Sequence, residues 1–140
     1  MIVLDTNVIS EVLRPIPEPA VLNWLRSMRR GDLWTSSIVL AELLSGVDLL
    51  PAGKRQQFLR EKMEQMVSTI FTGRILTFNF AAARAYGSIL ATRQRMGRPI
   101  DEMDALIAAT ALTNGAALAT RNIADFEHCG IALVNPWKAA

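Results

Sequence analysis

Small polar side chains open the most chemically suggestive part of this sequence, directly after the apolar run at residues 2–4. Asp5, Thr6 and Asn7 stand where a short buried strand should end and a helix should begin. In open α/β sheets, ligands bind in the crevice beyond the carboxyl ends of the strands. A carboxylate with two hydrogen-bonding neighbours in that crevice can hold a hard cation, but it can equally cap the helix.

Two further carboxylates lie within apolar sequence. Glu42 interrupts the apolar segment 38–44, and a lone ionised carboxylate is costly to bury unless it is paired or binds a metal. It could instead lie on the exposed edge of a helix, paired with a lysine. Asp104 is followed by an uninterrupted apolar run, so we expect it at the open end of a buried helix, facing a crevice. Asp101, three residues earlier, suits the N-cap of that helix.

A second polar segment follows the expected strand at residues 117–119. It contains Thr120, Asn122 and Asp125, and Asp125 either joins the other acids or caps the turn that carries Phe126. Oxygen ligands of these types predict a site for Mg²⁺, with Mn²⁺ as the alternative. A cation there would polarise a phosphoryl oxygen and lower the pKa of water. It would also let a polyanion approach a pocket that is lined with acids.

Alternating short strands and helices separate these residues along the chain. The apolar patterns and turn residues predict strands at 2–4, 33–35, 75–77, 117–119 and 131–134, and helices at 8–13, 20–29, 37–50, 54–69, 81–96 and 102–113. This alternation implies right-handed crossovers and an α/β fold. We therefore expect a short, mostly parallel central sheet of about five strands with helices on both faces, formed by residues 1–140 as one domain.

The composition is that of an ordinary globular protein. The 140 residues include 15 basic and 13 acidic side chains, and a net charge of +2 does not by itself indicate a nucleic-acid binder. The apolar run at 105–112 is too short to cross a bilayer, and the first residues lack the pattern of a signal peptide. Cys129 cannot form an internal disulfide, which favours the cytoplasm. A single histidine, His128, excludes histidine-rich zinc sites and mechanisms that need a histidine pair.

Two other phosphate-handling classes fit these residues less well. A haloacid-dehalogenase phosphatase with Asp5 as nucleophile needs a second aspartate two residues later, where this chain has Asn7. A response-regulator receiver domain needs adjacent acids after the first strand and a late lysine. Asp5 has no acidic neighbour, and residues 110–137 contain no lysine.

The sequence resembles the PIN-domain ribonucleases, specifically toxins of the VapC type and their FitB-like branch. The matching segments are LDTNVISE at 4–11, AELLSG at 41–46, DALIAATA at 104–111, ATRNIADF at 119–126 and VNPW at 134–137. They extend over essentially the whole chain, and their order is more specific than any one of them. The resemblance implies a PIN-like fold and a Mg²⁺-dependent endoribonuclease that serves as the toxin of a type II toxin–antitoxin system.

The resemblance also assigns roles to individual residues. It implies Asp5 and Asp104 as direct metal ligands and Glu42 as the third member of the acidic cluster. The full catalytic set is then Asp5, Glu42, Asp104 and Asp125, with support from Thr6, Asn7, Thr120 and Asn122. The fourth acid of the family often falls at the position of Asn122, so either Asn122 or Asp125 fills that place, and the site holds one metal or two.

Partners follow from the same resemblance. It implies an RNA substrate, a homodimer, and a hetero-oligomer with a VapB-like antitoxin whose tail can insert a basic side chain into the acidic pocket. DNA would be reached only through the antitoxin, and no membrane is involved. The helices within residues 38–69 are expected to form much of the antitoxin groove, although their apolar faces could simply pack in the core. The alternative function is a degenerate PIN fold that binds a partner without cutting RNA.

Overall fold

A five-stranded parallel sheet forms the centre of the protein, of which the computed structural model describes residues 1–139. The strands of the described chain are β1 (Ile2–Leu4), β2 (Leu33–Ser36), β3 (Ile75–Leu76), β4 (Ala117–Ala119) and β5 (Leu133–Val134). Their order across the sheet is β3-β2-β1-β4-β5, and every neighbouring pair is parallel. The expected α/β fold is confirmed, with a sheet that is entirely rather than mostly parallel.

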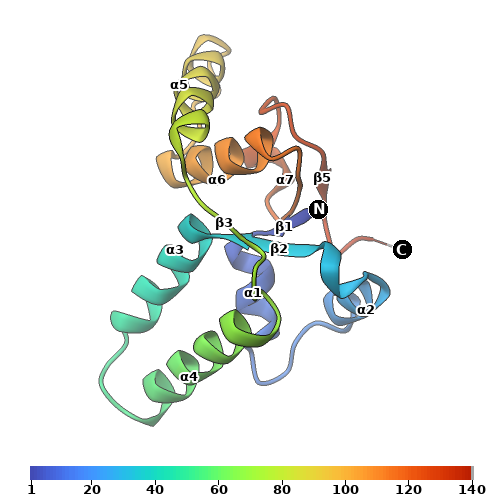
Figure 1. Ribbon diagram of the computed structural model, residues 1–140, viewed down its shortest axis with the longest axis vertical. Coiled ribbons are helices and arrows are strands. Elements are labelled where there is room, and N and C mark those ends of the chain that lie inside the picture. Colours follow the sequence, from blue (N-terminus) through green and yellow to red (C-terminus); the bar gives the residue numbers. More distant parts are fainter. Residues whose placement is uncertain (140) are drawn as a thin grey trace.

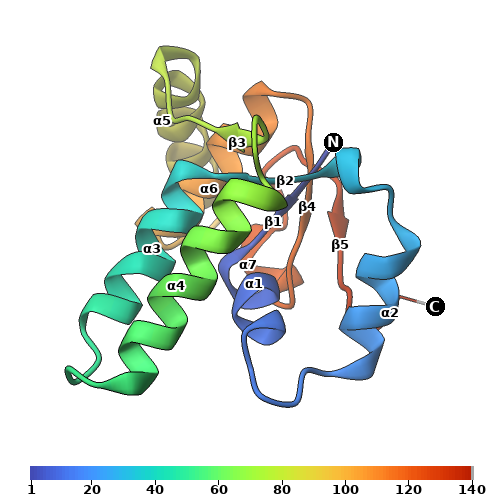
Figure 2. The same ribbon diagram turned by 60° about the horizontal axis from the view of Figure 1, so that its bottom comes forward.

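Seven α-helices connect and cover these strands in the described part of the chain. They are α1 (Thr6–Val12), α2 (Pro19–Ser27), α3 (Ser37–Asp48), α4 (Lys54–Thr69), α5 (Phe80–Arg95), α6 (Glu102–Thr113) and α7 (Ile123–Phe126). Figure 1 shows α5 and α6 on one side of the sheet and α1 and α4 on the other. Both views show α3 and α4 side by side as a helical hairpin (Figures 1 and 2).

Most element boundaries lie within two residues of those expected from the sequence, and the differences have local causes. The first helix begins at Thr6 rather than at residue 8, because Asp5 occupies its N-cap and accepts a hydrogen bond from the Thr6 backbone N–H. The last strand contains only Leu133–Val134 rather than residues 131–134, because pairing with β4 begins at Leu133. Residues 30–32 form a short 3₁₀ helix between the second helix and the second strand.

Side-chain caps fix where the longer helices begin. Ser36 Oγ accepts the Val39 backbone N–H at 3.1 Å, which ends β2 and starts α3 within one residue. Asp101 Oδ2 accepts the backbone N–H groups of Met103 at 3.1 Å and Asp104 at 3.4 Å. The predicted N-cap role of Asp101 is therefore confirmed, and the cap sets the position of Asp104 in the first turn of α6.

The strand order creates a topological switch point at the centre of the sheet. From β1 the chain builds outward through β2 and β3, and it then crosses over to add β4 and β5 on the other side of β1. The carboxyl ends of β1 and β4 therefore lie side by side, and they lead into Asp5 and Thr120. A crevice at such a reversal is the usual ligand site of an open α/β sheet.

Buried apolar side chains pack around the two strands that lead into this crevice. Val3 of β1, Leu118 of β4 and Ile107 of α6 are fully buried in one hydrophobic cluster. Residues Ala105 and Ala108 of α6 are also fully buried, and their small side chains allow the helix to lie close to its neighbours. None of the helices in residues 1–139 combines the length and apolar character needed to span a membrane.

Candidate functional site

Asp5 lies at the mouth of the sheet and is only 4% exposed. Its Oδ1 accepts the Thr6 backbone N–H at 2.8 Å, while its Oδ2 accepts Thr120 Oγ1 at 2.7 Å and Asn7 Nδ2 at 3.1 Å. Burial raises the pKa of the Asp5 carboxyl, and the nearby Glu42 charge raises it further, although these hydrogen bonds act in the opposite direction. Asp5 therefore caps α1 and also lines the pocket, so the two roles considered for it do not exclude each other.

Hydrogen bonds between the β1 and β4 segments align the polar groups around Asp5. Thr120 is fully buried behind Asp5, and its Oγ1 accepts the Asn122 backbone N–H at 3.1 Å. Asn7 Oδ1 accepts the Arg121 backbone N–H at 3.2 Å. Thr120 and Asn7 therefore orient the Asp5 carboxylate and tie it to the loop that follows β4.

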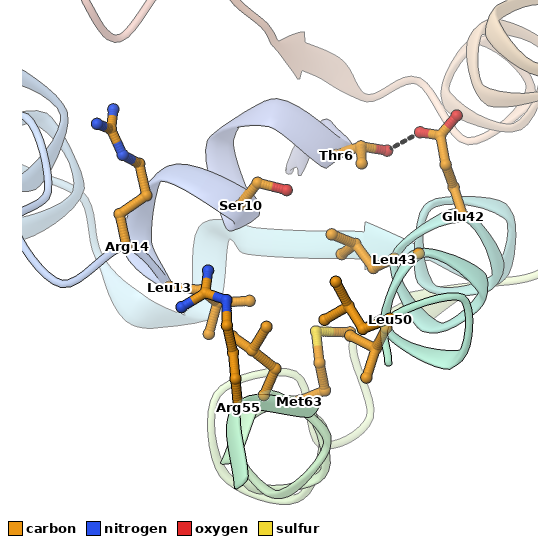
Figure 3. Close-up of a pocket in the computed structure, with 12 residues that line it drawn as sticks. Thr6, Ser10, Leu13, Arg14, Glu42, Leu43, Leu50, Arg55 and Met63 are labelled. Atoms are coloured by element: carbon orange, nitrogen blue, oxygen red, sulfur yellow. Dashed lines mark hydrogen bonds between the residues drawn. The ribbon is translucent and has the colours of Figure 1, made fainter. Parts of the chain in front are cut away.

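Glu42 reaches the same place from α3. It is half-buried, and its carboxylate accepts a hydrogen bond from Thr6 Oγ1, as the dashed line in Figure 3 shows. No lysine of residues 1–139 forms an ion pair with it, so the alternative of an exposed Glu42–lysine pair is wrong. The next residue, Leu43, is buried in the core, while the Glu42 side chain faces Thr6.

Asp104 approaches from the first turn of α6 and is half-buried. Burial is the main cause that raises the pKa of its carboxyl to about 7, and the negative charges of Asp5, Asp101, Asp125 and Glu42 add to the increase. An opposite charge bound in the cavity would favour the ionised form of Asp104.

A cavity of about 460 Å³ brings most of the expected site residues together. Its lining includes Asp5, Thr6, Asn7, Glu42, Asp104 and Asn122. Thr120 lies behind this lining, and Asp125 lies outside it, exposed on α7. The alternative that Asp125 caps α7 is also wrong, because Asn122 occupies the N-cap position and Asp125 lies within the helix.

The chemistry of the cavity fits a hard divalent cation. Its acids and hydroxyl groups are oxygen donors, and neither histidine nor cysteine lines it. Within residues 1–139, no three histidine, cysteine, aspartate or glutamate side chains converge tightly enough to bind a metal alone. Magnesium suits this spacing, since it usually takes one or two carboxylates directly and keeps several waters. Asp5, Glu42 and Asp104 all line this cavity with carboxylate oxygens.

Comparison with known proteins agrees with this geometry. A family model described as PIN domain matches residues 2–130. The chain belongs to the PIN-domain family. Its 140 residues are 41% identical to the VapC ribonuclease Y4jK of Sinorhizobium fredii, with both chains covered in full. It is 43% identical to Toxin FitB of Neisseria gonorrhoeae over 98% of this chain and 99% of FitB.

The solved structures give the same assignment for this PIN domain. A chain from the structure of FitAB bound to an IR36 DNA fragment superposes with a TM-score of 0.93 at 42% identity, covering 100% of this chain and 98% of the other. The expected resemblance to VapC-type toxins and to their FitB-like branch is therefore confirmed.

Several residues that line the pocket of this PIN domain were not assigned a site role from the sequence. Glu11 is 5% exposed, and its carboxylate accepts Arg14 Nη1 at 3.2 Å and the Glu18 backbone N–H at 3.2 Å. Arg14 lies three residues after Glu11, just beyond the end of α1, and this short spacing was an available signal for the pair. Arg121 and Trp137 also line the cavity, and only their places in the matching motifs pointed to them.

Proposed function

We propose that this PIN domain is the toxin of a type II toxin–antitoxin system and acts as a divalent-metal-dependent endoribonuclease. The observation that carries the proposal is that Asp5, Glu42 and Asp104 line one cavity at the switch point of the sheet. Relatives named as a VapC ribonuclease and as Toxin FitB support the same activity. The retained acids argue against a degenerate fold that only binds a partner.

Each residue of the proposed active site has a separate role. Asp5 and Asp104 hold the cation, for which Mg²⁺ is the proposed ion and Mn²⁺ a substitute. When bound, such a cation polarises the phosphoryl oxygen and lowers the pKa of water. Glu42, oriented by Thr6, positions the attacking water on the side of the cavity that α3 forms. Thr120 and Asn7 keep the Asp5 carboxylate in its orientation.

One strongly held cation is proposed rather than two. Asn122 stands in the cavity lining without a charge, whereas Asp125 lies outside the lining. Asp125 acts on the site through its charge, which contributes to the raised pKa of Asp104. Hydrolysis by water would leave 5′-phosphate and 3′-hydroxyl ends on the RNA.

A hydrophobic groove next to Glu42 is the proposed antitoxin site. A hollow of about 440 Å³ starts at Thr6 and Glu42 and continues between α1, α3 and α4 over Leu43, Leu50 and Met63 (Figure 3). A second hollow of about 550 Å³ adjoins it. Its lining has four basic residues and no acidic ones; the basic residues are Arg14, Arg30, Arg55 and Lys62.

These surfaces suit an antitoxin tail with apolar and acidic residues over the groove and a basic residue at the acidic cavity. The structural relative is a FitAB complex bound to DNA, which supports contact with DNA through the antitoxin rather than through this chain. The expected homodimer and hetero-oligomer belong to the same proposal. Because the substrate is cellular RNA, the proposed place of action is the cytoplasm.

Cleavage by the purified chain tests this function. Single-stranded and structured RNAs are incubated with Mg²⁺, with Mn²⁺ and with a chelator, and the product ends are identified chemically. Cleavage should require the metal and leave 5′-phosphates, while Asp5→Asn and Asp104→Asn should each abolish it in correctly folded protein. A cyclic phosphate product formed in chelator, or full activity of both variants, would contradict the proposal.

A further inference from the structure

The acidic cavity has a second wall of different chemistry, formed by Arg121, Asn122 and Trp137. The guanidinium carbon of Arg121 lies 5.1 Å from the centroid of the Trp137 ring, in cation–π contact. Asp5 and Asp104 line the same cavity. A flat aromatic ring with a stacked cation therefore adjoins the carboxylates that are proposed to hold the metal.

Trp137 is fixed by its own turn after β5. Its backbone N–H donates to Asn135 Oδ1 at 3.0 Å, and Asn135 O accepts the N–H groups of Lys138 and Ala139 at 3.0 Å. The neighbouring Pro136 is buried, and part of the indole packs against the hydrophobic core while the remainder is accessible. A ring held in this way can receive a ligand without first having to be ordered.

Arg121 is connected through its backbone to the acidic centre, and its side chain is exposed beside the Trp137 ring. Its N–H donates to Asn7 Oδ1 at 3.2 Å, and Asn7 Nδ2 in turn donates to Asp5 Oδ2 at 3.1 Å. Arg14, which also lines the cavity, forms an ion pair with Glu11 at 3.2 Å. Within residues 1–139, no carboxylate lies within ion-pair distance of Arg121. Its charge is therefore the one on this wall that can meet a phosphate.

We propose that Arg121 and Trp137 form a nucleotide subsite that receives an unstacked base of single-stranded RNA next to the bond that is cut. This inference rests on the proposed ribonuclease function and names the form of its substrate. The base stacks on the accessible face of the Trp137 indole, while the Arg121 guanidinium binds the phosphate of that nucleotide. The next phosphate then enters the acidic cavity, at the cation between Asp5 and Asp104.

The physical chemistry of RNA explains why the subsite selects single strands. A base in an A-form duplex is stacked on both faces, so it has no face to offer an aromatic side chain, whereas loops and ends can present one. Stacking on an aromatic ring tolerates different bases because each base has a π-face. Trp137 therefore favours unpaired RNA without dictating its sequence, and Arg121 adds a contact that is sensitive to salt.

Binding of a short, fluorescein-labelled single-stranded RNA of randomised sequence tests the subsite. The affinity is measured by fluorescence anisotropy in an Asp5→Asn background, so that the RNA stays intact. Trp137→Ala should weaken binding about 10- to 100-fold, and Trp137→Phe should restore most of the loss. Arg121→Ala should weaken binding and lower the slope of log affinity against log salt by about 0.7, the value for one phosphate contact on a single strand.

The chain contains a matched control for both substitutions. Phe80 and Arg84 on α5 form a similar pair, with the guanidinium carbon 5.8 Å from the ring centroid, and neither residue lines the acidic cavity. Phe80→Ala and Arg84→Ala should leave the RNA affinity and its salt dependence unchanged. Equal effects at the two pairs would mean that any exposed aromatic–arginine pair binds RNA, and this outcome would overturn the proposal.

A second measurement keeps the test decisive if Trp137→Ala unfolds. An abasic nucleotide is placed at each position around the cleaved bond, and cleavage by the otherwise unchanged protein is followed. One flanking position should show a loss of kcat/KM, and Trp137→Phe should show a smaller loss there. If cleavage tolerates an abasic nucleotide equally at every position, the subsite is overturned. It is also overturned if the Trp137 and Arg121 variants bind RNA normally and only weaken the antitoxin complex. If the unmodified protein neither binds nor cuts any RNA, the proposed function itself fails.

Discussion

The hydroxyl of Thr120 donates a hydrogen bond of 2.7 Å to Oδ2 of Asp5 and joins two residues 115 positions apart in the sequence. Thr120 follows β4 and Asp5 follows β1. These parallel strands are neighbours because the chain, after β3, crosses back to add β4 on the other side of β1. The bond orients the carboxylate that is expected to hold the cation. It also opposes the rise in the pKa of Asp5 that burial causes.

Removal of this hydroxyl should weaken metal binding without dismantling the fold. Thr120→Val keeps the shape of the buried side chain but leaves Asp5 Oδ2 with one donor fewer, so the Asp5 pKa should rise further. Removing a group that orients a metal ligand typically lowers the metal affinity about 10- to 100-fold. We expect a loss of about tenfold in Mg²⁺ affinity. Isothermal titration calorimetry of both proteins at pH 7 measures it.

Two variants serve as controls for Thr120→Val. Thr120→Ser retains the hydroxyl and should bind Mg²⁺ almost as the unmodified chain does. Thr110, also fully buried, donates to the Leu106 carbonyl at 2.8 Å within α6. Thr110→Val should therefore lower the stability but leave the Mg²⁺ affinity unchanged. A similar affinity for Thr120→Val and the unmodified chain would refute the orienting role.

The fold was predictable from local patterns, whereas the contacts within the site were not. The apolar run of α6 and the cap at Asp101 are properties of neighbouring residues, so the sequence revealed them. The bond from Thr6 to Glu42 instead joins residues 36 positions apart, and it depends on how α3 docks against α1. The apolar context of Glu42 signalled an unusual carboxylate, but only the packing of the two helices shows which partner it meets.

The stability of the metal-free protein should depend on pH through Asp104. Its pKa is about 7 in the folded protein and about 3.9 in an unfolded chain, so the folded state binds the extra proton between these values. The free energy of unfolding should therefore fall as the pH rises from 4 to 7 in chelator. One proton accounts for at most about 1.4 kcal/mol per pH unit, and partial exposure of Asp104 reduces this slope.

Replacing the carboxyl isolates this contribution. The side chain of the Asp104→Asn variant cannot ionise, so its free energy of unfolding should not fall in this way as the pH rises. Near pH 7 in chelator, the variant should be more stable than the unmodified chain. Urea unfolding across the pH range measures the difference. Asp48→Asn is a control, because Asp48 is 66% exposed at the end of α3 and pairs only with Arg60 within the described chain. Equal pH slopes for Asp104→Asn and the unmodified chain would contradict the prediction.

Added Mg²⁺ should reverse the stability order of these proteins. A ligand that binds only the folded state stabilises it by about 2.7 kcal/mol at a concentration 100 times its Kd. The unmodified chain should gain this stability, and its Tm should rise with Mg²⁺ concentration. Asp5→Asn and Asp104→Asn should gain much less, because each lacks a proposed ligand. Thermal unfolding at constant ionic strength separates this specific effect from screening, and equal gains in all three would argue against a site between Asp5 and Asp104.

A buried arginine joins the end of α5 to the segment around α7. Arg93 is 4% exposed, and its guanidinium donates to the backbone carbonyls of Arg98 at 2.7 Å, Asp125 at 2.8 Å and Glu127 at 3.0 Å. Arg93→Met should leave these carbonyls without a donor and destabilise the protein by about 2–4 kcal/mol. Arg95→Ala, on the exposed side of the same helix, should change the stability by less than about 0.5 kcal/mol. Similar urea midpoints for the two variants would show that Arg93 is not needed to join these segments.

Charge reversal in the hydrophobic groove should separate antitoxin binding from catalysis. Arg55 lines both hollows between α1 and α4 but not the acidic cavity, so Arg55→Glu should repel an acidic antitoxin tail and leave RNA cleavage intact. The matched control is Arg60→Glu, because Arg60 lies on the same helix and lines none of these cavities, although it loses an exposed ion pair with Asp48. Co-expression with the antitoxin and co-purification should show less complex for Arg55→Glu only, together with growth arrest that the antitoxin no longer relieves. If both variants retain the complex equally, the basic hollow does not contribute to antitoxin binding.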